Sequence, residues 1–381
     1  MIATRLLLTN WKNFKSVDIC LRERVFIVGQ NAAGKSNLLD VFRFLRDIAK
    51  TRGGGLQQAV SVRGQMTRIR SLAARNPPHV EIEVHLGESN EEEPIYRYSI
   101  GIQQENRGKR RVLLTHEKVW HDNELILNRP DSDDEKDTER LTRTFLETPT
   151  NNADFREVAE FFAGISYLHL VPQLLRSVKS VDIEAAGEDF YGRNFLVRVS
   201  QTPERIRKAR LKKILEALSK AVPQFDALKD EKDGAGVPHL LLRLKHWRQD
   251  AGWQNEEQFS DGTIRMLGLF WSMLEGDTML LFEEPELSLN ERIVEQLAGL
   301  LYKLQASRGR QSILTTHSYS LLSDPGVTPE EVVLLEPANE STIATVASDI
   351  SEVVALVEAG LPVGQAVLPR TAPQTVSDIT L

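Results

Sequence analysis

The sequence is poor in cysteine and in long apolar runs, and each shortage excludes a class of protein. The 381 residues include one cysteine, Cys20, so the chain cannot form an internal disulfide. Cys20 lies in the apolar alternation of Val17, Ile19 and Leu21, which predicts a small buried side chain. No stretch of about 18 apolar residues occurs, and the N-terminus lacks the basic and apolar pattern of a signal peptide. We therefore expect a cytoplasmic protein without a membrane span.

The chain also lacks an excess of basic residues. It has 47 lysines and arginines against 54 acidic residues, for a formal net charge of −7. This balance argues against an evenly basic nucleic-acid surface but leaves room for a local basic groove. A composition of 41% hydrophobic and 27% charged residues is that of an ordinary folded protein. The length permits one elaborated domain or two subdomains.

A glycine-bearing loop follows the third β-like run of the chain. Apolar runs at residues 6–8, 17–21 and 25–28 predict three strands, and the apolar spacing over residues 38–48 predicts an amphipathic helix. The segment between the last strand and this helix matches the P-loop, whose N–H groups and helix start bind phosphate. Its lysine neutralises the β- and γ-phosphates, and its serine binds Mg²⁺. The residues assigned to the nucleotide are Gly29, Gln30, Asn31, Ala32, Ala33, Gly34, Lys35, Ser36 and Asn37.

A second apolar run, residues 278–282, ends in two adjacent carboxylates, Glu283 and Glu284. Adjacent carboxylates at a strand tip repel each other, which is tolerable beside a divalent cation and an attacking water. We expect Glu283 to share the Mg²⁺ site with Ser36. Glu284 is the candidate general base for attack on the γ-phosphate. An acidic surface turn is the alternative interpretation.

Ser260, Asp261, Gly262 and Thr263 open a predicted helix over residues 264–274. A helix start with small residues and free N–H groups is a second anion-binding element. Because one phosphate chain does not need two cradles from one subunit, we expect this one to cap a γ-phosphate bound to another subunit in a head-to-tail dimer. Taken alone, the pattern is a good helix N-cap.

A histidine ends one more apolar run. His317 follows residues 313–316, and of the eight histidines it is the one that we place directly after such a strand. An imidazole at this position can contact the γ-phosphate and respond to its loss. The sequence therefore adds His317 to Glu284 as a candidate catalytic residue.

The order of these motifs resembles the ABC-type ATPase heads of the RecF, SMC and OLD families, a group described as AAA_21-like ATP-binding proteins. The segment 8–16 also looks like their first β-hairpin, and the resemblance makes Lys15 of this hairpin a candidate phosphate contact. The resemblance implies an α/β head with a mixed sheet and flanking helices, ATP and Mg²⁺ as cofactors, and ATP hydrolysis. It assigns residues 29–36 to Walker A, 260–263 to the signature, 283–284 to Walker B, 286–290 to the D-loop and His317 to the switch.

Three features depart from the family pattern. The metal acid of Walker B is usually aspartate, whereas Glu283 stands here. The sequence does not decide which of Gln57, Gln58 and Gln65 is the Q-loop glutamine. Relatives of the OLD type carry a Toprim nuclease, but only 64 residues (381 minus 317) follow His317, and they contain no Asp-x-Asp pair. We therefore expect no nuclease domain in this chain.

The motifs divide the chain into a split core and an inserted lobe. We assign residues 1–50 and 255–340 to the ATPase core, 51–254 to a mixed α+β and helical insert, and 341–381 to a C-terminal extension. The glycine- and arginine-containing stretch 53–75 is expected to be irregular, and the aspartate-rich run 128–140 to be a solvated loop.

The inserted lobe carries the candidate DNA-binding residues. A basic amphipathic helix is predicted over residues 203–222, with Ile206 among the residues of its apolar face. A basic cluster precedes it, consisting of Arg107, Lys109, Arg110 and Arg111. Together they are a candidate groove for a DNA backbone, although clusters of this kind are more often solvated faces.

The leading functional hypothesis is an ATP-hydrolysing switch that closes as a homodimer, or as part of a larger assembly. Resemblance to defence and repair ATPases implies that it controls DNA or a separately encoded nuclease or effector, in anti-phage defence or DNA repair. A nucleotide-gated scaffold that does not hydrolyse ATP is the first alternative. A transporter ATPase subunit is the second, and the signature and the large insert fit it poorly.

Overall fold

The computed structural model describes residues 1–74, 78–105, 110–176, 191–246, 248 and 252–372. The chain forms two compact units, each assembled from separate segments. Unit 1 consists of Met1–Ser166, Asp277–Leu281 and Ala298–Leu381. Unit 2 consists of Tyr167–Gly276 and Phe282–Leu297.

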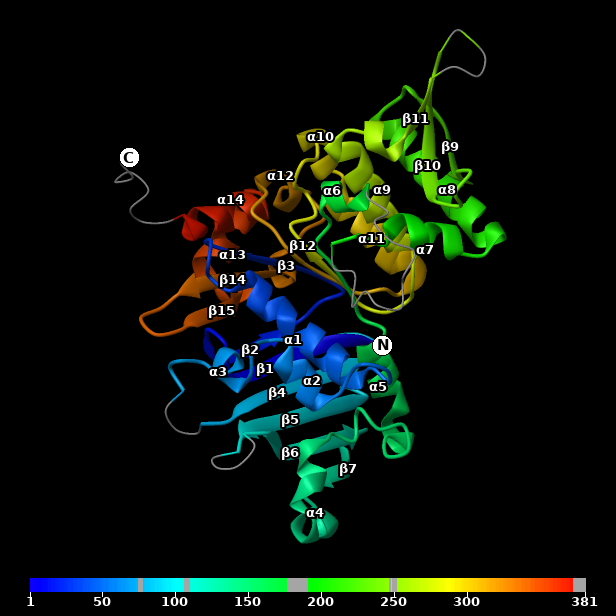
Figure 1. Cartoon of the computed structure of the whole chain (residues 1–381). Coiled ribbons are helices and arrows are strands. Elements are labelled where there is room, and N and C mark those ends of the chain that lie inside the picture. Colours follow the sequence, from blue (N-terminus) through cyan, green and yellow to red (C-terminus); the bar gives the residue numbers. More distant parts are fainter. Residues whose placement is uncertain (75–77, 106–109, 177–190, 247, 249–251, 373–381) are drawn as a thin grey trace, which may run out of the picture. The chain divides into compact units, whose positions relative to one another are not determined.

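Unit 1 contains a six-stranded antiparallel sheet in the order β2-β1-β4-β5-β6-β7 (Figure 1). Its strands alternate apolar and polar residues, as expected for a sheet with one buried face. In β4 and β5, Ile82 lies opposite Ile100 and Val84 lies opposite Tyr98, and all four side chains are buried. The bounds are β1 Ile2–Trp11, β2 Phe14–Cys20, β4 Val80–Gly87, β5 Tyr96–Gln104, β6 Val112–His121 and β7 Glu124–Arg129.

A second six-stranded sheet has the order β15-β14-β3-β13-β12-β8. Strands β13 and β14 run parallel to β3, and β15 runs antiparallel to β14, so the sheet is mixed. Every residue of β3 is buried, which explains its unbroken apolar run. The predicted α/β class is confirmed. The bounds are β3 Arg24–Gly29, β8 Ser166–Leu168, β12 Leu280–Glu283, β13 Ser312–Thr315, β14 Val332–Pro337 and β15 Thr342–Val346.

Helix α1, Lys35–Ala49, directly follows the glycine-bearing loop and packs against α5, Arg156–Ala163. It has the predicted buried face, with Leu38, Phe42 and Leu45 at most 2% exposed. The stretch 53–75, expected to be irregular, contains two short helices. The other helices here are α2 Leu56–Ser61, α3 Met66–Ile69, α4 Ser132–Lys136, α11 Leu297–Arg308, α12 Tyr319–Leu322, α13 Ser351–Glu358 and α14 Val363–Val367.

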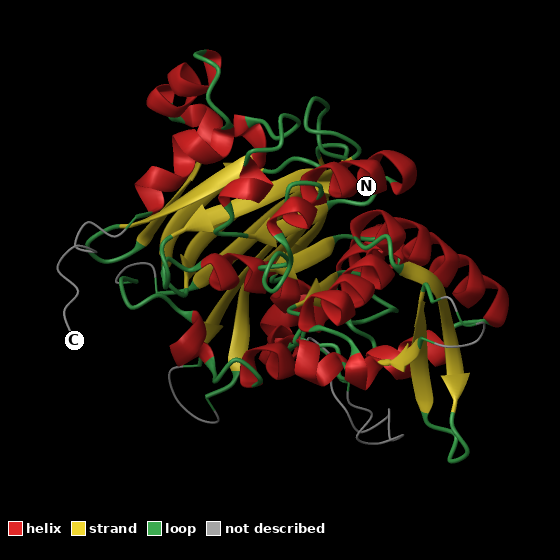
Figure 2. Ribbon diagram, turned by 90° about the horizontal axis from the view of Figure 1, so that it is seen from above, coloured by secondary structure: helices red, strands yellow, loops and turns green. Residues whose placement is uncertain are grey.

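Unit 2 is built around helix α9, Asp261–Leu274, which is buried from Thr263 to Met273. Helices α6 and α8 pack against it, and α8 also covers strand β9 of a three-stranded sheet in the order β11-β10-β9 (Figures 1 and 2). The bounds are α6 Pro172–Leu175, α7 Phe195–Gln201, α8 Glu204–Ala221, β9 Phe225–Lys232, β10 Pro238–Leu244, β11 Trp253–Asn255 and α10 Glu291–Val294.

Three sequence predictions about burial are wrong. Cys20 is exposed because side chains alternate along β2, which places it on the face opposite Ile19. The aspartate-rich run is exposed along most of its length, but it contains α4 in place of a loop, and its Asp134 is fully buried against Arg129. Ile206 is 46% exposed, because only the later turns of α8 lie against the core.

Within the part of the chain that the structure describes, no helix combines the length and the apolar character needed to cross a bilayer.

Candidate nucleotide-binding site

The loop between β3 and α1 has the backbone of a phosphate cradle. Ala32 and Gly34 have φ angles of 65° and 99°, and Gly34 is the N-cap of α1. The Lys35 ammonium donates to the carbonyl oxygens of Gly29 and Gln30, at 3.2 Å each. The loop therefore curls around the lysine at the positive end of a 15-residue helix, an arrangement that suits an anion.

Two glycines of this loop have no room for a side chain. A Cβ on Gly29 would lie 2.7 Å from the Leu335 carbonyl oxygen of β14, and one on Gly34 would overlap the Asn13 amide. Gly34 also has a left-handed backbone. The predicted P-loop glycines are thus required by the packing of this structure, which fits a loop that holds phosphate with its backbone.

Replacing Gly34 by alanine is expected to weaken ATP binding at least about 10-fold, a loss of about 1.4 kcal/mol. Alanine at this φ costs roughly 1–2 kcal/mol, and its methyl group would displace Asn13 or the loop. Gly53→Ala is the matched control, because Gly53 has a φ of 68° and no atom within 4 Å of an added Cβ. Binding of a fluorescent ATP analogue measures both variants. Equal affinity of the two would contradict this role of Gly34.

The loop is held by Asn13, a residue that the sequence did not single out. Its Nδ2 donates to the Ala33 carbonyl oxygen at 2.9 Å and to Thr342 Oγ1 at 2.8 Å. Its Oδ1 accepts from Asn37 Nδ2 at 2.7 Å. The β1–β2 hairpin thus positions the P-loop through Asn13. Lys15, the hairpin residue that the family resemblance assigned to phosphate, is exposed on β2.

Asp40 on α1 is the centre of a buried ionic cluster beside this hairpin. Its carboxylate lies 2.7 Å from Lys12 Nζ and accepts two hydrogen bonds from Arg63, at 2.9 Å each. Burial alone would raise the pKa of Asp40, but the charges of Arg63 and Lys12 outweigh it and lower the pKa. An open pocket of about 730 Å³ adjoins the cluster, lined by Lys12, Asn13, Asn37, Arg63, Thr67, Arg68, Ser71, Leu72 and Glu340.

His317 lies at the same end of the sheet as the P-loop. In the parallel pair β3–β13, Thr315 is opposite Ile27, and the Thr316 N–H donates to the Ile27 carbonyl oxygen at 3.1 Å. The chain therefore reaches His317 where β3 leads into the loop, and the His317 side chain is exposed there. Parallel strands bring these two distant motifs together within unit 1.

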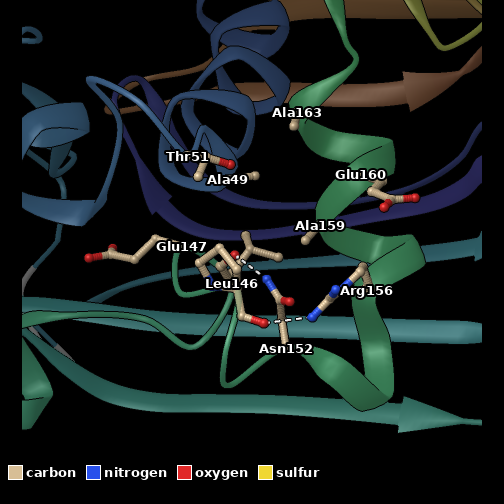
Figure 3. Close-up of a pocket in the computed structure, with 10 residues that line it drawn as sticks. Ala49, Thr51, Leu146, Glu147, Asn152, Arg156, Ala159, Glu160 and Ala163 are labelled. Atoms are coloured by element: carbon tan, nitrogen blue, oxygen red, sulfur yellow. Dashed lines mark hydrogen bonds between the residues drawn. The ribbon is translucent and has the colours of Figure 1, made fainter.

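A second cavity, of about 220 Å³, lies at the other end of α1 (Figure 3). Ala49 of α1 and Ala159 of α5 line it, and Asn152 and Arg156 donate to the carbonyl oxygens of Leu146 and Pro149. A 15-residue helix spans about 22 Å. This cavity is therefore too far along α1 to contact a phosphate held at Lys35.

Unit 2 carries the paired carboxylates. Glu284 has a φ of 45°, a left-handed conformation that is unusual for a residue with a Cβ. Arg265 of α9 is 4% exposed, and its Nη2 lies 3.4 Å from the Glu284 carbonyl oxygen. Burial lowers the pKa of Arg265, against the nearby charges of Glu286 and Glu284. Backbone strain of this kind concentrates at functional sites, which supports a catalytic role for Glu284.

Two side chains that the sequence did not reveal contact Glu283. The Tyr167 hydroxyl donates to Glu283 Oε2, and His169 Nδ1 lies 3.9 Å from the same oxygen. His169 directly follows β8, so the expectation that among the histidines only His317 follows such a strand is wrong. The sequence signal for the strand before His169 was weak, because β8 has only three residues.

The Ser260–Thr263 segment forms the predicted helix start. Ser260 is the N-cap of α9 and accepts from the Thr263 N–H at 3.2 Å. A Cβ on Gly262 would lie 2.8 Å from the Ser288 carbonyl oxygen, so the two segments that the resemblance assigns to the signature and the D-loop are in close contact. Arg176 Nη2 lies 2.5 Å from Asp261 Oδ1, which neutralises the one anionic residue of a segment expected to face phosphate.

The described residues supply few metal ligands. They contain no group of three or more His, Cys, Asp or Glu side chains that could hold a metal ion. A Mg²⁺–nucleotide site does not need one, since it typically uses one or two protein oxygens together with phosphate and water. Glu283, whose side chain is 17% exposed, fits that role.

The chain matches a family model over residues 24–323, described as "AAA domain, putative AbiEii toxin, Type IV TA system". It belongs to this family, AAA_21. A comparison with curated protein sequences finds no match.

Two solved SMC heads have the fold of this AAA_21 protein. The first, an SmcHead bound to the C-winged helix domain of ScpA, has a TM-score of 0.58 and 14% identity, covering 91% of this chain and 98% of that one. The second, a Pyrococcus furiosus Smc head domain bound to the C-terminal domain of ScpA, has a TM-score of 0.54 and 13% identity, covering 94% and 99%. The resemblance to ABC-type, SMC-like P-loop ATPases is confirmed.

Proposed function

We propose that this AAA_21 protein is an ATP-hydrolysing switch that closes as a head-to-tail dimer on ATP. The observation that carries the proposal is the P-loop, in which the backbone wraps around Lys35 at the start of α1. A bound γ-phosphate would replace the carbonyl oxygens of Gly29 and Gln30 as the partner of the Lys35 ammonium. This exchange makes the loop sensitive to the charge of its ligand.

Each motif receives one role in hydrolysis. Lys35 and the N–H groups of residues 29–36 hold the β- and γ-phosphates, and Ser36 and Glu283 hold Mg²⁺. The cation, when bound, neutralises charge that develops on the phosphate oxygens. Glu284 orients the attacking water and accepts its proton, and His317 contacts the γ-phosphate. Each of these roles requires only a contact that the functional group of the side chain can make.

We assign the nucleoside to the open pocket beside the P-loop. Asn13 and Asn37 line this pocket and also bind each other, and Asn13 bonds the loop itself. A base that entered the pocket would meet the Lys12 stem, Arg68 and the 99% exposed Leu72. A volume of about 730 Å³ suffices for an adenosine group.

The dimer is supported by the second cradle, Ser260–Thr263. Its capped helix start and neutralised Asp261 suit a phosphate that this subunit does not itself hold. Symmetric exchange of such cradles produces two shared sites. The SMC heads of similar fold were solved with a domain of ScpA. By analogy with these head–partner complexes, we propose that this protein binds a separately encoded nuclease or effector, in anti-phage defence or DNA repair.

DNA is a further proposed ligand, through helix α8. Arg205, Lys212 and Lys213 are exposed on this helix, whereas Lys208 pairs with Glu204 at 2.5 Å. In the preceding basic cluster, Arg107 and Lys109 lie outside the described residues, and Arg111 pairs with Glu105 and Glu139. The exposed cations of α8 are therefore the stronger support for backbone contacts.

Replacing Lys35 by alanine is expected to weaken ATP binding at least about 10-fold and to reduce turnover below detection, because a charge-assisted contact to phosphate is lost. Lys303→Ala, an exposed lysine on α11, is the control. Phosphate release and analogue binding are measured with and without duplex DNA. A wild type that binds ATP but never hydrolyses it would favour the scaffold, and one that binds none would refute the proposal.

A further inference from the structure

His169 and Glu283 form an acid–imidazole pair that does not make a direct hydrogen bond. His169 Nδ1 is buried, it has no hydrogen-bond partner, and it lies 3.9 Å from Glu283 Oε2. The Tyr167 hydroxyl donates to the same oxygen, and the Tyr191 ring packs edge-on against the imidazole at 5.9 Å. Both side chains are thus held in place with a gap between their polar atoms.

Three other histidines of the chain lie within hydrogen-bonding distance of a carboxylate. His79, His85 and His239 lie 2.7–2.8 Å from the nearest oxygen of Glu81, Glu83 and Glu256, the distance of a hydrogen bond. The 3.9 Å between His169 Nδ1 and Glu283 Oε2 is too long for a hydrogen bond. A metal ion about 2.1 Å from each of these two atoms would fit between them. Tyr167 already supplies the donor that Glu283 Oε2 would take from an imidazole N–H.

We propose that His169 Nδ1 is a further protein ligand, beside Glu283 and Ser36, of the divalent cation, and that it shifts the preference of this site from Mg²⁺ toward Mn²⁺ and similar transition metals. The inference rests on the proposed function, in which Glu283 binds the nucleotide-associated cation. Imidazole nitrogen is a good ligand for transition metals, whereas Mg²⁺ favours oxygen. Tyr167 acts as a positioning residue that orients the carboxylate.

The pair cannot complete a coordination shell by itself. In the parts of the chain described above, no third His, Cys, Asp or Glu side chain joins these two at metal-binding distance. The Ser36 hydroxyl, oxygens of the nucleotide and water must therefore fill the remaining positions. Tight Mn²⁺ binding is consequently expected with a bound ATP analogue and only weak binding without one.

The test uses the full chain with a non-hydrolysable ATP analogue and Mn²⁺. Electron spin echo spectra of the wild type are expected to show coupling of Mn²⁺ to an imidazole nitrogen, which shifts when histidine is labelled with ¹⁵N. In His169→Gln the coupling should disappear and Mn²⁺ affinity should fall about 10-fold or more. Mg²⁺ affinity, measured by competition, should change less than about twofold. His246→Gln, an exposed histidine of unit 2, is the control.

Each other outcome identifies what has failed. Analogue binding by the wild type without imidazole coupling overturns the role of His169 and leaves the proposed function standing. Equal losses of Mg²⁺ and Mn²⁺ affinity in His169→Gln also overturn it, since they indicate a structural role. No analogue binding by the wild type refutes the proposed function itself. If His169→Gln does not fold, the labelled spectrum of His317→Gln still decides, because that variant retains His169 and lacks the histidine assigned to the γ-phosphate.

Discussion

Glu284→Gln is expected to lower ATP turnover at least about 100-fold while ATP binding stays within about twofold of the wild type. A general base contributes roughly 10²–10⁴-fold to a rate, and the glutamine amide cannot accept the proton of the attacking water. The substitution keeps the size of the side chain. It also leaves unchanged the φ of 45° at this position, because both residues have the same branching at Cβ. A loss of rate would therefore report on the carboxylate and not on the backbone.

The same variant tests the shared sites. If hydrolysis reopens a closed pair of heads, Glu284→Gln should accumulate an ATP-dependent dimer that the wild type forms only transiently. Mass photometry with ATP, with ADP and without nucleotide measures this. Glu257→Gln is the matched control, an exposed carboxylate shortly before the signature. A variant that still hydrolyses ATP and stays monomeric would show that both the base and the second cradle are wrongly assigned.

The elements around the P-loop were predictable because their signals are local. The run of β3 is apolar over its whole length since both of its faces are buried, and α1 has a regular buried stripe. The Ser260 cap also depends on neighbours within three residues. These features follow from hydrogen bonding and burial within one strand or one turn of helix, which a single sequence records directly.

The contacts around Glu283 and Asp134 have no such local signal. Tyr167 meets Glu283 across 116 residues of sequence, and β8 is too short to show a period. Asp134 lies in a run of acidic residues whose composition indicates solvent, but Arg129 draws this one side chain inward. Pairing of distant charges depends on how strands are arranged, and the composition of a segment does not report it.

Arg129 is the centre of a fully buried ionic cluster in the antiparallel sheet. Its side chain is 1% exposed and lies 3.0 Å from Glu117 and 2.8 Å from Asp134, both of which are 0% exposed. Glu117 also accepts from the Phe145 and Leu146 N–H groups, so the cluster fastens the segment after β7 to the sheet. Burial alone would raise the pKa of Asp134, but hydrogen bonds from Arg129 and its other partners hold that pKa far below its usual range.

Arg129→Met is therefore expected to lower the free energy of unfolding by about 3–5 kcal/mol, because the buried Glu117 loses its counter-charge and Asp134 keeps only Arg140, at 3.0 Å. Urea denaturation measures the loss, and Arg143→Met, an exposed arginine nearby, should change stability by less than about 0.5 kcal/mol. The depressed pKa of Asp134 stabilises the wild type above about pH 4, and this contribution is lost on acidification.

The variant should consequently lose part of the acid dependence of stability along with the stability itself. Combining Arg129→Met with Glu117→Gln and Asp134→Asn removes the unpaired charges and should recover part of the loss. A loss below about 1 kcal/mol in Arg129→Met alone would mean that water reaches the cluster, since solvated carboxylates need no counter-charge. Recovery in the triple variant would instead show that the cost lies in the buried charge and not in the volume of the arginine.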